Sequence, residues 1–175
     1  MLMRYPISKV TFAIATMILV TIITTVALYS LTESASAQNL PKFIIKLTGS
    51  QEVPPVQTDA VGVAQISAYS AGENTLSYTI NVKNITGVTA GHTHLGKKGE
   101  NGPIVLTFFK YDTPRNNVSE TGSIKADMLE GPMKGKPLSD LALAALNGSL
   151  YINIHTEKNA NGEIRGQIGG SILES

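Results

Sequence analysis

Hydrophobic and polar residues alternate with a period of two along several short segments beyond residue 42. Such alternation predicts β-strands that bury one face and expose the other. The clearest segment is 76–82, whose hydrophobic positions are Leu76, Tyr78, Ile80 and Val82. Similar segments lie at 43–48, 104–108, 124–127, 150–155 and 163–168. The chain is therefore predicted to be mostly β-structure.

Between residues 61 and 69 the alternation changes phase, from Val61 and Val63 to Ile66 and Ala68. A β-bulge inserts one extra residue into a strand and exchanges its faces in this way. We therefore expect a bulge in this segment.

One segment has helical rather than strand spacing. Its hydrophobic positions are Leu138, Leu141, Ala142, Ala145 and Leu146. Pro137 stands near its start and Asn147-Gly148 follows its end, as is typical of helix boundaries. We expect a short helix in the connection between two strands.

Turn residues separate the predicted strands. Clusters of Pro, Gly and Asn lie at residues 54–55, 71–74, 101–103 and 161–162, and these residues favour turns and loops. Seven or eight short strands with turn signals every ~8–12 residues predict an antiparallel sandwich or barrel. With the one short helix, the predicted fold class is all-β.

Residues 1–37 have the pattern of a targeting segment. Two basic residues precede an uncharged stretch at residues 10–31, and an A-x-A-like site follows at 35–37. This order is typical of a secretory signal peptide. The uncharged stretch is also long enough to cross a bilayer, which takes ~20 residues, so an uncleaved anchor helix is the alternative. In both cases residues 38–175 are exported, either secreted or held at the extracellular face of the membrane through residues 10–31.

Three Asn-x-Ser/Thr sequons lie in the exported part, at Asn84, Asn117 and Asn147. Each is an acceptor for N-linked glycan in a host that glycosylates exported proteins. The motif is short and often arises by chance, so the sequence leaves glycosylation open.

The composition excludes several classes of function. The formal net charge is only +1, which provides no electrostatic surface for nucleic acid. There is no cysteine, so a disulfide scaffold, a thiol nucleophile and a thiolate zinc site are excluded. Nucleophile-elbow and phosphate-loop motifs are absent as well. The candidate chemistry therefore rests on three histidines.

His92 and His94 form an H-x-H pair. In an extended segment, residues two apart point to the same side, so both imidazoles project from one face, ~6–7 Å apart. His155 ends the strand predicted at 150–155, on the face opposite its hydrophobic residues. Three neutral imidazoles suit copper or zinc and leave one coordination position open. We therefore predict a metal site at His92, His94 and His155.

The alternative interpretation of these residues is structural. His92, His94, Asn153 and Arg165 would then form a buried polar network that ties loops to the sheet. The sequence alone leaves both interpretations open.

Three motifs resemble, in the same order, those of the CHRD family, the domain named after chordin. They are LTGSQEVPP at residues 47–55, HTHLG followed by GENGPIV at residues 92–105, and YINIHT followed by NGEIRGQ at residues 151–167. The resemblance covers nearly the whole exported part. It implies an extracellular, immunoglobulin-like β-sandwich and leaves the biochemical role undefined.

A weaker similarity is to the β-sandwich of copper/zinc superoxide dismutase. On this similarity His92 and His94 match its paired copper ligands and His155 matches a later copper ligand. Arg165 stands where its anion-steering arginine would be. The bridging histidine, the zinc ligands and the disulfide have no counterpart in this sequence. The similarity therefore implies at most the copper half of such a site.

These observations favour an exported binding or structural module that carries a three-histidine metal site. Its partner would be an extracellular protein or an envelope component that the sequence does not identify. The alternative is an enzyme, a copper-dependent superoxide-scavenging protein in which Arg165 attracts the anion, or a copper-handling protein.

Overall fold

The computed structural model describes residues 42–67 and 74–169. The predicted signal peptide or anchor at residues 1–37 lies outside these ranges. Within them, no helix is long and apolar enough to cross a membrane.

Eight strands, three short 3-10 turns and one α-helix make up the described part. The strands are β1 (Lys42–Thr48), β2 (Val61–Ser67), β3 (Leu76–Lys83), β4 (Val88–Leu95), β5 (Ile104–Arg115), β6 (Val118–Ile124), β7 (Leu150–Thr156) and β8 (Ile164–Ile168). The 3-10 turns are η1 (Gly49–Gln51), η2 (Ala126–Met128) and η3 (Gly131–Met133), and the helix is α2 (Leu138–Leu146).

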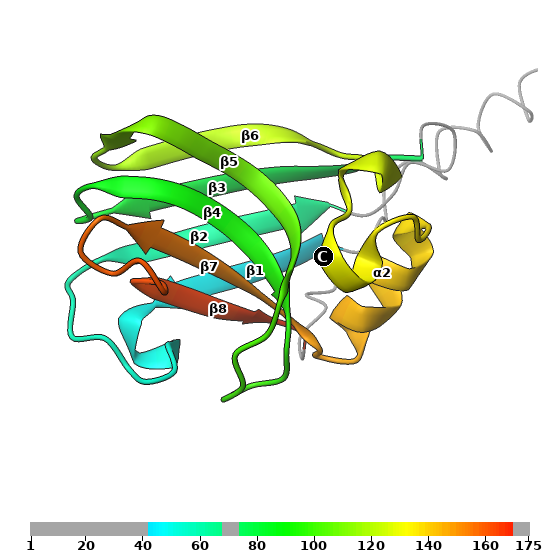
Figure 1. The fold of residues 1–175 in the computed structure, drawn as a ribbon, viewed down its shortest axis with the longest axis horizontal. Helices are drawn as coiled ribbons and strands as arrows, with labels where there is room; N and C mark the ends of the chain where they lie inside the picture. Colours follow the sequence, from blue (N-terminus) through cyan, green and yellow to red (C-terminus); the bar gives the residue numbers. More distant parts are fainter. Residues whose placement is uncertain (1–41, 68–73, 170–175) are drawn as a thin grey trace, which may run out of the picture. The chain divides into compact units, whose positions relative to one another are not determined.

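All eight strands belong to one sheet, in the order β5-β4-β7-β8-β1-β2-β3-β6. Every pairing is antiparallel. The sheet curls on itself, as Figure 1 shows. Tyr78 Oη of β3 donates a hydrogen bond to Phe108 O of β5 at 3.0 Å, which links strands near the two edges of the sheet.

The predicted all-β antiparallel class with one short helix is confirmed. The sandwich implied by the family resemblance needs a correction, because the strands form one continuous, barrel-like sheet instead of two separate ones. The narrowest joint is between β1 and β8, where a single residue pair, Thr48 with Arg165, is in register. The alternation of residues predicted either a sandwich or a barrel, and the barrel describes this sheet better.

The bulge expected between residues 61 and 69 is wrong for the described part of that segment. The pairing of β2 with β1 runs without interruption from Val61 to Ser67. Val61 and Val63 are 48% and 38% exposed, whereas Gly62, Ala64 and Ile66 are buried. Gly62 faces inward, and Leu47 fills the space that a side chain at this position would need. The expected change of phase came from placing Val61 and Val63 on the buried face, whereas they lie on the exposed face.

The irregular strand is β4 instead. Its register with β5 shifts between Gly91 and His92 and again between Thr93 and His94. Gly91 faces inward, since a Cβ there would meet the ring of Phe109 at 2.6 Å. Alternation then places Thr93 on the inner side and the two histidines on the outer side of the sheet.

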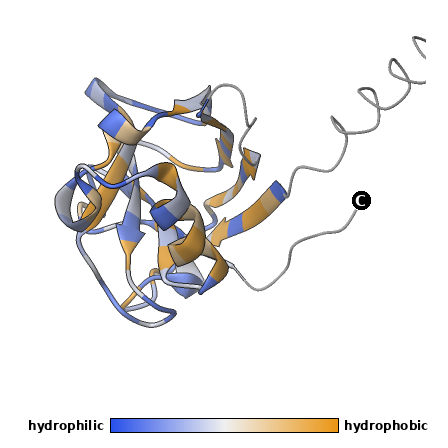
Figure 2. Cartoon of the chain, turned by 90° about the vertical axis from the view of Figure 1, so that its right-hand side faces the viewer, coloured by the Kyte–Doolittle hydropathy of each residue, from blue (hydrophilic) through white to orange (hydrophobic). Residues whose placement is uncertain are grey.

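The helix α2 covers one end of the barrel, on the right in Figure 1. Its residues Leu138, Leu141 and Ala145 are buried, which confirms the helix predicted from their spacing. Figure 2 looks onto this end and shows the hydrophobic colouring of much of α2 and of strands around it. The hydrophobic residues inside the barrel and beneath α2 form one core.

Gly166 tests the narrow joint between β1 and β8. A Cβ at this position would lie 2.5 Å from Lys46 O and 2.5 Å from Ile45 Cγ2. Backbone cannot move aside as a flexible side chain does, so Gly166→Ala is expected to lower the free energy of unfolding by about 1–3 kcal/mol. Urea unfolding measures the change. Ser77→Ala, on the exposed face of β3, is the control and should stay within about 0.5 kcal/mol of the parent protein.

Candidate metal centre

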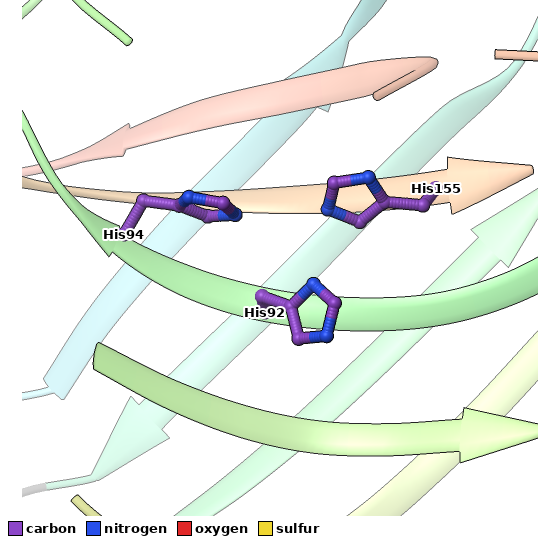
Figure 3. Close-up of side chains that lie close together, drawn as sticks. All are labelled: His92, His94 and His155. Carbon is purple, nitrogen blue, oxygen red and sulfur yellow. The ribbon is translucent and has the colours of Figure 1, made fainter. Parts of the chain in front are cut away.

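The structure brings together the three histidines that the sequence singled out. His92 and His94 project from β4 and His155 from β7, the neighbouring strand (Figure 3). The ring centroid of His92 lies 5.8 Å from that of His94 and 4.8 Å from that of His155, and the other two centroids are 5.8 Å apart. One possible ligand atom from each residue lies within 4.8 Å of the others. The predicted convergence on one face is therefore present.

Backbone carbonyls fix the orientation of two of the rings. His94 Nδ1 lies 2.9 Å from Gly102 O, and His155 Nδ1 lies 2.9 Å from Ala160 O. Because a carbonyl oxygen only accepts, each Nδ1 carries the proton and donates it. The lone pair is then on Nε2 in both rings. Metal-binding histidines are commonly oriented by a hydrogen bond of this kind.

One nitrogen of each ring is buried and has no hydrogen-bond partner among the described residues. These nitrogens are His92 Nδ1, His94 Nε2 and His155 Nε2. Buried polar atoms in folded proteins nearly always have a partner. Three such atoms side by side therefore need an explanation, which a shared ligand would supply.

Burial keeps the three imidazoles neutral. It lowers the pKa of His92 to about 4, with further lowering by His155, His94 and Lys110. Burial also lowers the pKa values of His94 and His155, although their hydrogen bonds to backbone carbonyls act in the opposite direction. Neutral imidazole is the form that binds a metal ion.

Tyr151 separates the cluster from Arg165. The rings of His94 and Tyr151 stack with centroids 4.9 Å apart and an angle of 9° between their planes. Arg165 Cζ lies 3.4 Å from the centroid of the tyrosine ring, in cation–π contact. Because Tyr151 lies on β7, between β4 and β8, the order across the sheet is histidine, tyrosine, arginine.

Arg165 holds the loop that follows β4. It is only 1% exposed, and Nη2 donates to Lys97 O at 3.0 Å while Nη1 donates to Asn101 Oδ1 at 3.3 Å. The same loop provides Gly102, whose N–H donates to Tyr151 Oη at 3.1 Å and whose carbonyl oxygen orients His94. The arginine thus acts on the cluster through the loop and through Tyr151.

The sequence did not indicate that Glu52 belongs to this buried face. It follows η1, is 5% exposed, and accepts a hydrogen bond from Asn153 Nδ2 at 3.2 Å. Burial raises the pKa of Glu52 to about 7, although Arg165 and Asn153 oppose the rise. A single acid in a turn gives no periodic signal of burial. Its place in the motif SQEVPP was the available hint.

Glu163 joins the turn before β8 to neighbouring segments and is 8% exposed. Three donors reach its carboxylate: Thr58 Oγ1 at 2.7 Å, Thr156 Oγ1 at 2.7 Å and Asn159 Nδ2 at 3.0 Å. Burial alone would raise the pKa of Glu163, but these hydrogen bonds outweigh it and hold the pKa below the ordinary value.

These segments carry the three motifs noted in the sequence. A model of the CHRD domain matches residues 43–168. The chain belongs to the CHRD family. The CHRD motifs supply Glu52 from the first, His92, His94 and Gly102 from the second, and Tyr151, His155 and Arg165 from the third. Comparisons with curated proteins and with solved structures give no match.

Glu163 provides a test of stability against pH. Because its pKa is lower in the folded chain, its contribution is present above the ordinary value of 4.5 and is lost as pH falls through the folded-state pKa. Glu163→Gln is expected to lower the free energy of unfolding by about 1–3 kcal/mol at pH 7. The difference from the parent protein should shrink in acid, as urea unfolding at several pH values would show.

Glu157→Gln is the matched control, because Glu157 is an exposed acid in the same turn. Its effect should be small at both neutral and acidic pH. A constant loss for Glu163→Gln across the acid range would contradict the assigned role of the carboxylate.

Proposed function

We propose that this CHRD protein is an exported module that binds one copper or zinc ion through His92, His94 and His155. The observation that carries the proposal is the set of three buried imidazole nitrogens without partners in the described part of the chain. A metal ion would satisfy all three at once.

A purely structural network explains other residues better than it explains the histidines. The Arg165 guanidinium and Asn153 Nδ2 have partners on neighbouring loops, although Asn153 Oδ1 and Glu52 Oε1 have none among the described residues. The three imidazole nitrogens have none, and leaving a buried polar atom unpaired costs roughly 1–3 kcal/mol. The imidazoles differ from the other residues of the network because their ligand atoms also lie within 4.8 Å of one another, so that one ion could bind all three.

The donor set narrows the identity of the ion. Neutral imidazoles suit copper and zinc, whereas magnesium and calcium prefer oxygen ligands. Zinc binds imidazole at ~2.0–2.1 Å, so tetrahedral nitrogens around it lie about 3.4 Å apart. The present separations of up to 4.8 Å would close through small side-chain rotations. Three protein ligands leave one position for water or for a group from a partner.

Superoxide scavenging with copper is the alternative function. Its anion-steering residue would be Arg165, and such a residue attracts ions best when it faces solvent. Arg165 is 1% exposed and its guanidinium contacts Tyr151, Lys97 O and Asn101. These contacts favour a binding module that retains a metal over an enzyme that draws in superoxide.

The N-terminal pattern of residues 1–37 and the CHRD family together support export. The three sequon asparagines, Asn84, Asn117 and Asn147, are all exposed, so each would be accessible to a glycosylating enzyme. The loops at residues 51–56 and 96–102 are the proposed contact surface for an extracellular protein or an envelope component.

Metal analysis tests the proposal directly. Purified protein without a histidine tag, loaded with copper or zinc and then desalted, is expected to retain about one ion per chain, as zinc sites of this type do. His92→Ala should retain much less, because two ligands remain. Elemental analysis by mass spectrometry measures both.

Gln65→Ala, on β2 and away from the cluster, is the control and should retain as much metal as the parent protein. Metal below a tenth of an equivalent in the loaded parent protein would reject the metal site.

Thermal unfolding gives an independent test. A metal that binds only the folded chain stabilises it by about 2.7 kcal/mol at a free concentration 100 times Kd. The melting temperature of the parent protein should therefore rise with added zinc, whereas that of His155→Asn should not. An equal decrease in melting temperature for His155→Asn with and without zinc would indicate a purely structural histidine.

A further inference from the structure

Two buried oxygen atoms on neighbouring side chains lack a hydrogen-bond partner in the described part of the chain. They are Glu52 Oε1, from the segment that follows η1, and Asn153 Oδ1, from β7. The same two side chains are already joined, since Asn153 Nδ2 donates to Glu52 Oε2 at 3.2 Å. Both residues are buried, so bulk water does not supply the missing partners. The carboxyl and the amide therefore share one hydrogen bond and leave two acceptors over.

A backbone carbonyl fixes the orientation of the Asn153 amide. Nδ2 also lies 3.4 Å from Asn161 O, which only accepts, so the amide nitrogen belongs on this side. Its two hydrogens are then used on Asn161 O and on Glu52 Oε2. Exchanging the amide oxygen and nitrogen would place an acceptor against both of these acceptors. The oxygen Oδ1 is thus the atom of Asn153 that still needs a donor.

A proton on Glu52 would supply that donor. An ionised carboxylate only accepts, whereas a protonated one carries a hydroxyl that donates. We propose that Glu52 is held in the folded chain as a neutral acid whose Oε1 hydroxyl donates to Asn153 Oδ1, and that this proton holds residues 49–58 against β7. The acid and the amide then form two hydrogen bonds, and one proton satisfies both unpaired oxygens.

The surroundings of Glu52 favour the neutral form. Burial raises the pKa of Glu52 to about 7, and the positive charge of Arg165 on β8 opposes the rise. Arg165 forms no ion pair with Glu52 among the described residues. Its guanidinium donates instead to Lys97 O, Asn101 Oδ1 and Gln167 Oε1. The cation nearest to the carboxyl is therefore committed to other partners.

Other titratable side chains lie on the elements around Glu52. They are Lys46 on β1, Asp59 at the end of the same segment, Lys97, Lys98 and Glu100 in the loop after β4, His92 opposite Asn153 on β4, Tyr151 and His155 beside it on β7, and Lys158 and Glu163 in the turn before β8. Burial has the largest effect on Glu52 and Arg165 the next largest. The proton is thus retained because of burial and not because of a neighbouring acid.

Residues 49–58 pack on the outer side of β7 and β8. Besides Glu52, their ties to the rest of the chain include Val53 O, which accepts from Asn101 Nδ2 at 2.7 Å, and Thr58 Oγ1, which donates to Glu163 Oε1 at 2.7 Å. Loss of the proton would remove a bond from the middle of the segment and set a carboxylate oxygen against the amide oxygen. We therefore expect the segment to be held tightly in mildly acidic solution and loosened in alkaline solution.

The role of this proton is independent of the metal ion, because neither Glu52 nor Asn153 is a proposed ligand. The segment includes residues 51–56 of the proposed contact surface. An effect of pH on the binding of a partner would therefore rest on the proposed function, whereas the acid–amide pair does not. Its tests use metal-free protein with a chelator present, so their outcome is separate from that of the metal analysis.

Glu52→Gln tests the pair, because a glutamine amide presents one donor and one acceptor, as the protonated acid does. The pKa of Glu52 is raised on folding, so its contribution to stability is complete below the ordinary value of 4.5 and is lost as pH rises to about 7. The folding equilibrium constant of the parent protein should fall, relative to that of Glu52→Gln, by up to about tenfold per pH unit across this range. Urea unfolding at several pH values measures the ratio, from which the shared titration of the histidines cancels.

Asp59→Asn is the matched control, because Asp59 is an exposed acid at the end of the same segment. Its ratio to the parent protein should stay nearly constant between pH 4.5 and pH 8. An ionised Glu52 held by Arg165 would give the opposite result for Glu52→Gln, which would then be less stable than the parent protein at neutral pH. That result, or a ratio that does not change with pH, would overturn the proposal.

Infrared spectroscopy observes the proton in the parent protein itself, so this test does not depend on the folding of a variant. At pH 6 ordinary Asp and Glu side chains are ionised. The C=O stretch of a protonated carboxyl is therefore expected from Glu52 at pH 6, and it should disappear at pH 8 and in Glu52→Gln. A parent protein without this band at pH 6 would overturn the proposal.

Hydrogen exchange measures the hold on the segment. After correction for the intrinsic exchange rate at each pH, the amides of residues 49–58 should be less protected at pH 8 than at pH 6 in the parent protein. In Glu52→Gln their protection should be the same at both values. Equal protection in the parent protein at pH 6 and pH 8 would contradict the role of the proton in holding the segment.

Discussion

The burial of β7 on both faces is the constraint on which the rest of the structure depends. Every residue from Leu150 to Thr156 is buried. The inner side chains Leu150, Ile152 and Ile154 contribute to the core, as in any sheet with one hydrophobic face.

The outer side chains Tyr151, Asn153 and His155 are polar, so they need polar partners from other segments. The segment from η1 to Thr58, the loop after β4 and the turn before β8 provide these partners. Arg165 and Glu163 anchor those segments by hydrogen bonds to three different parts of the chain.

Period-two alternation predicted β1, β3, β5, β7 and β8, and helical spacing predicted α2, because burial of one face leaves a direct periodic record. The strand predicted at 124–127 is wrong, since β6 ends at Ile124 and the 3-10 turn η2 follows at Ala126–Met128. Alternation indicated β2 as well, but not its faces. It failed at β2, where Gly62 faces inward under Leu47 and the two valines face outward. The sequence alone does not distinguish a glycine that is closely packed within a strand from a glycine in a turn. The alternation also did not decide between a sandwich and a barrel-like sheet. Both have strands with one hydrophobic face, and they differ in which strands pair with each other.

The histidine cluster was predictable in part. The H-x-H spacing and the strand-end position of His155 placed all three rings on one face, and the register between β4 and β7 brings them together. The hydrogen bonds that orient the rings come from Gly102 and Ala160, through backbone atoms that every residue has. The burial of Glu52 depends on how a turn folds over the sheet. Neither feature leaves a periodic signal, so the sequence could not indicate them.

The position of β4 has a consequence for how the histidines can be changed. A single layer of backbone separates the interior of the barrel from the two imidazoles on this strand. Gly91 lies against the ring of Phe109 and Ile154 on the inner side, so an added methyl group there would displace either these two side chains or the strand. The geometry of His92 and His94 can thus be adjusted from within the core, by residues that never approach the rings themselves.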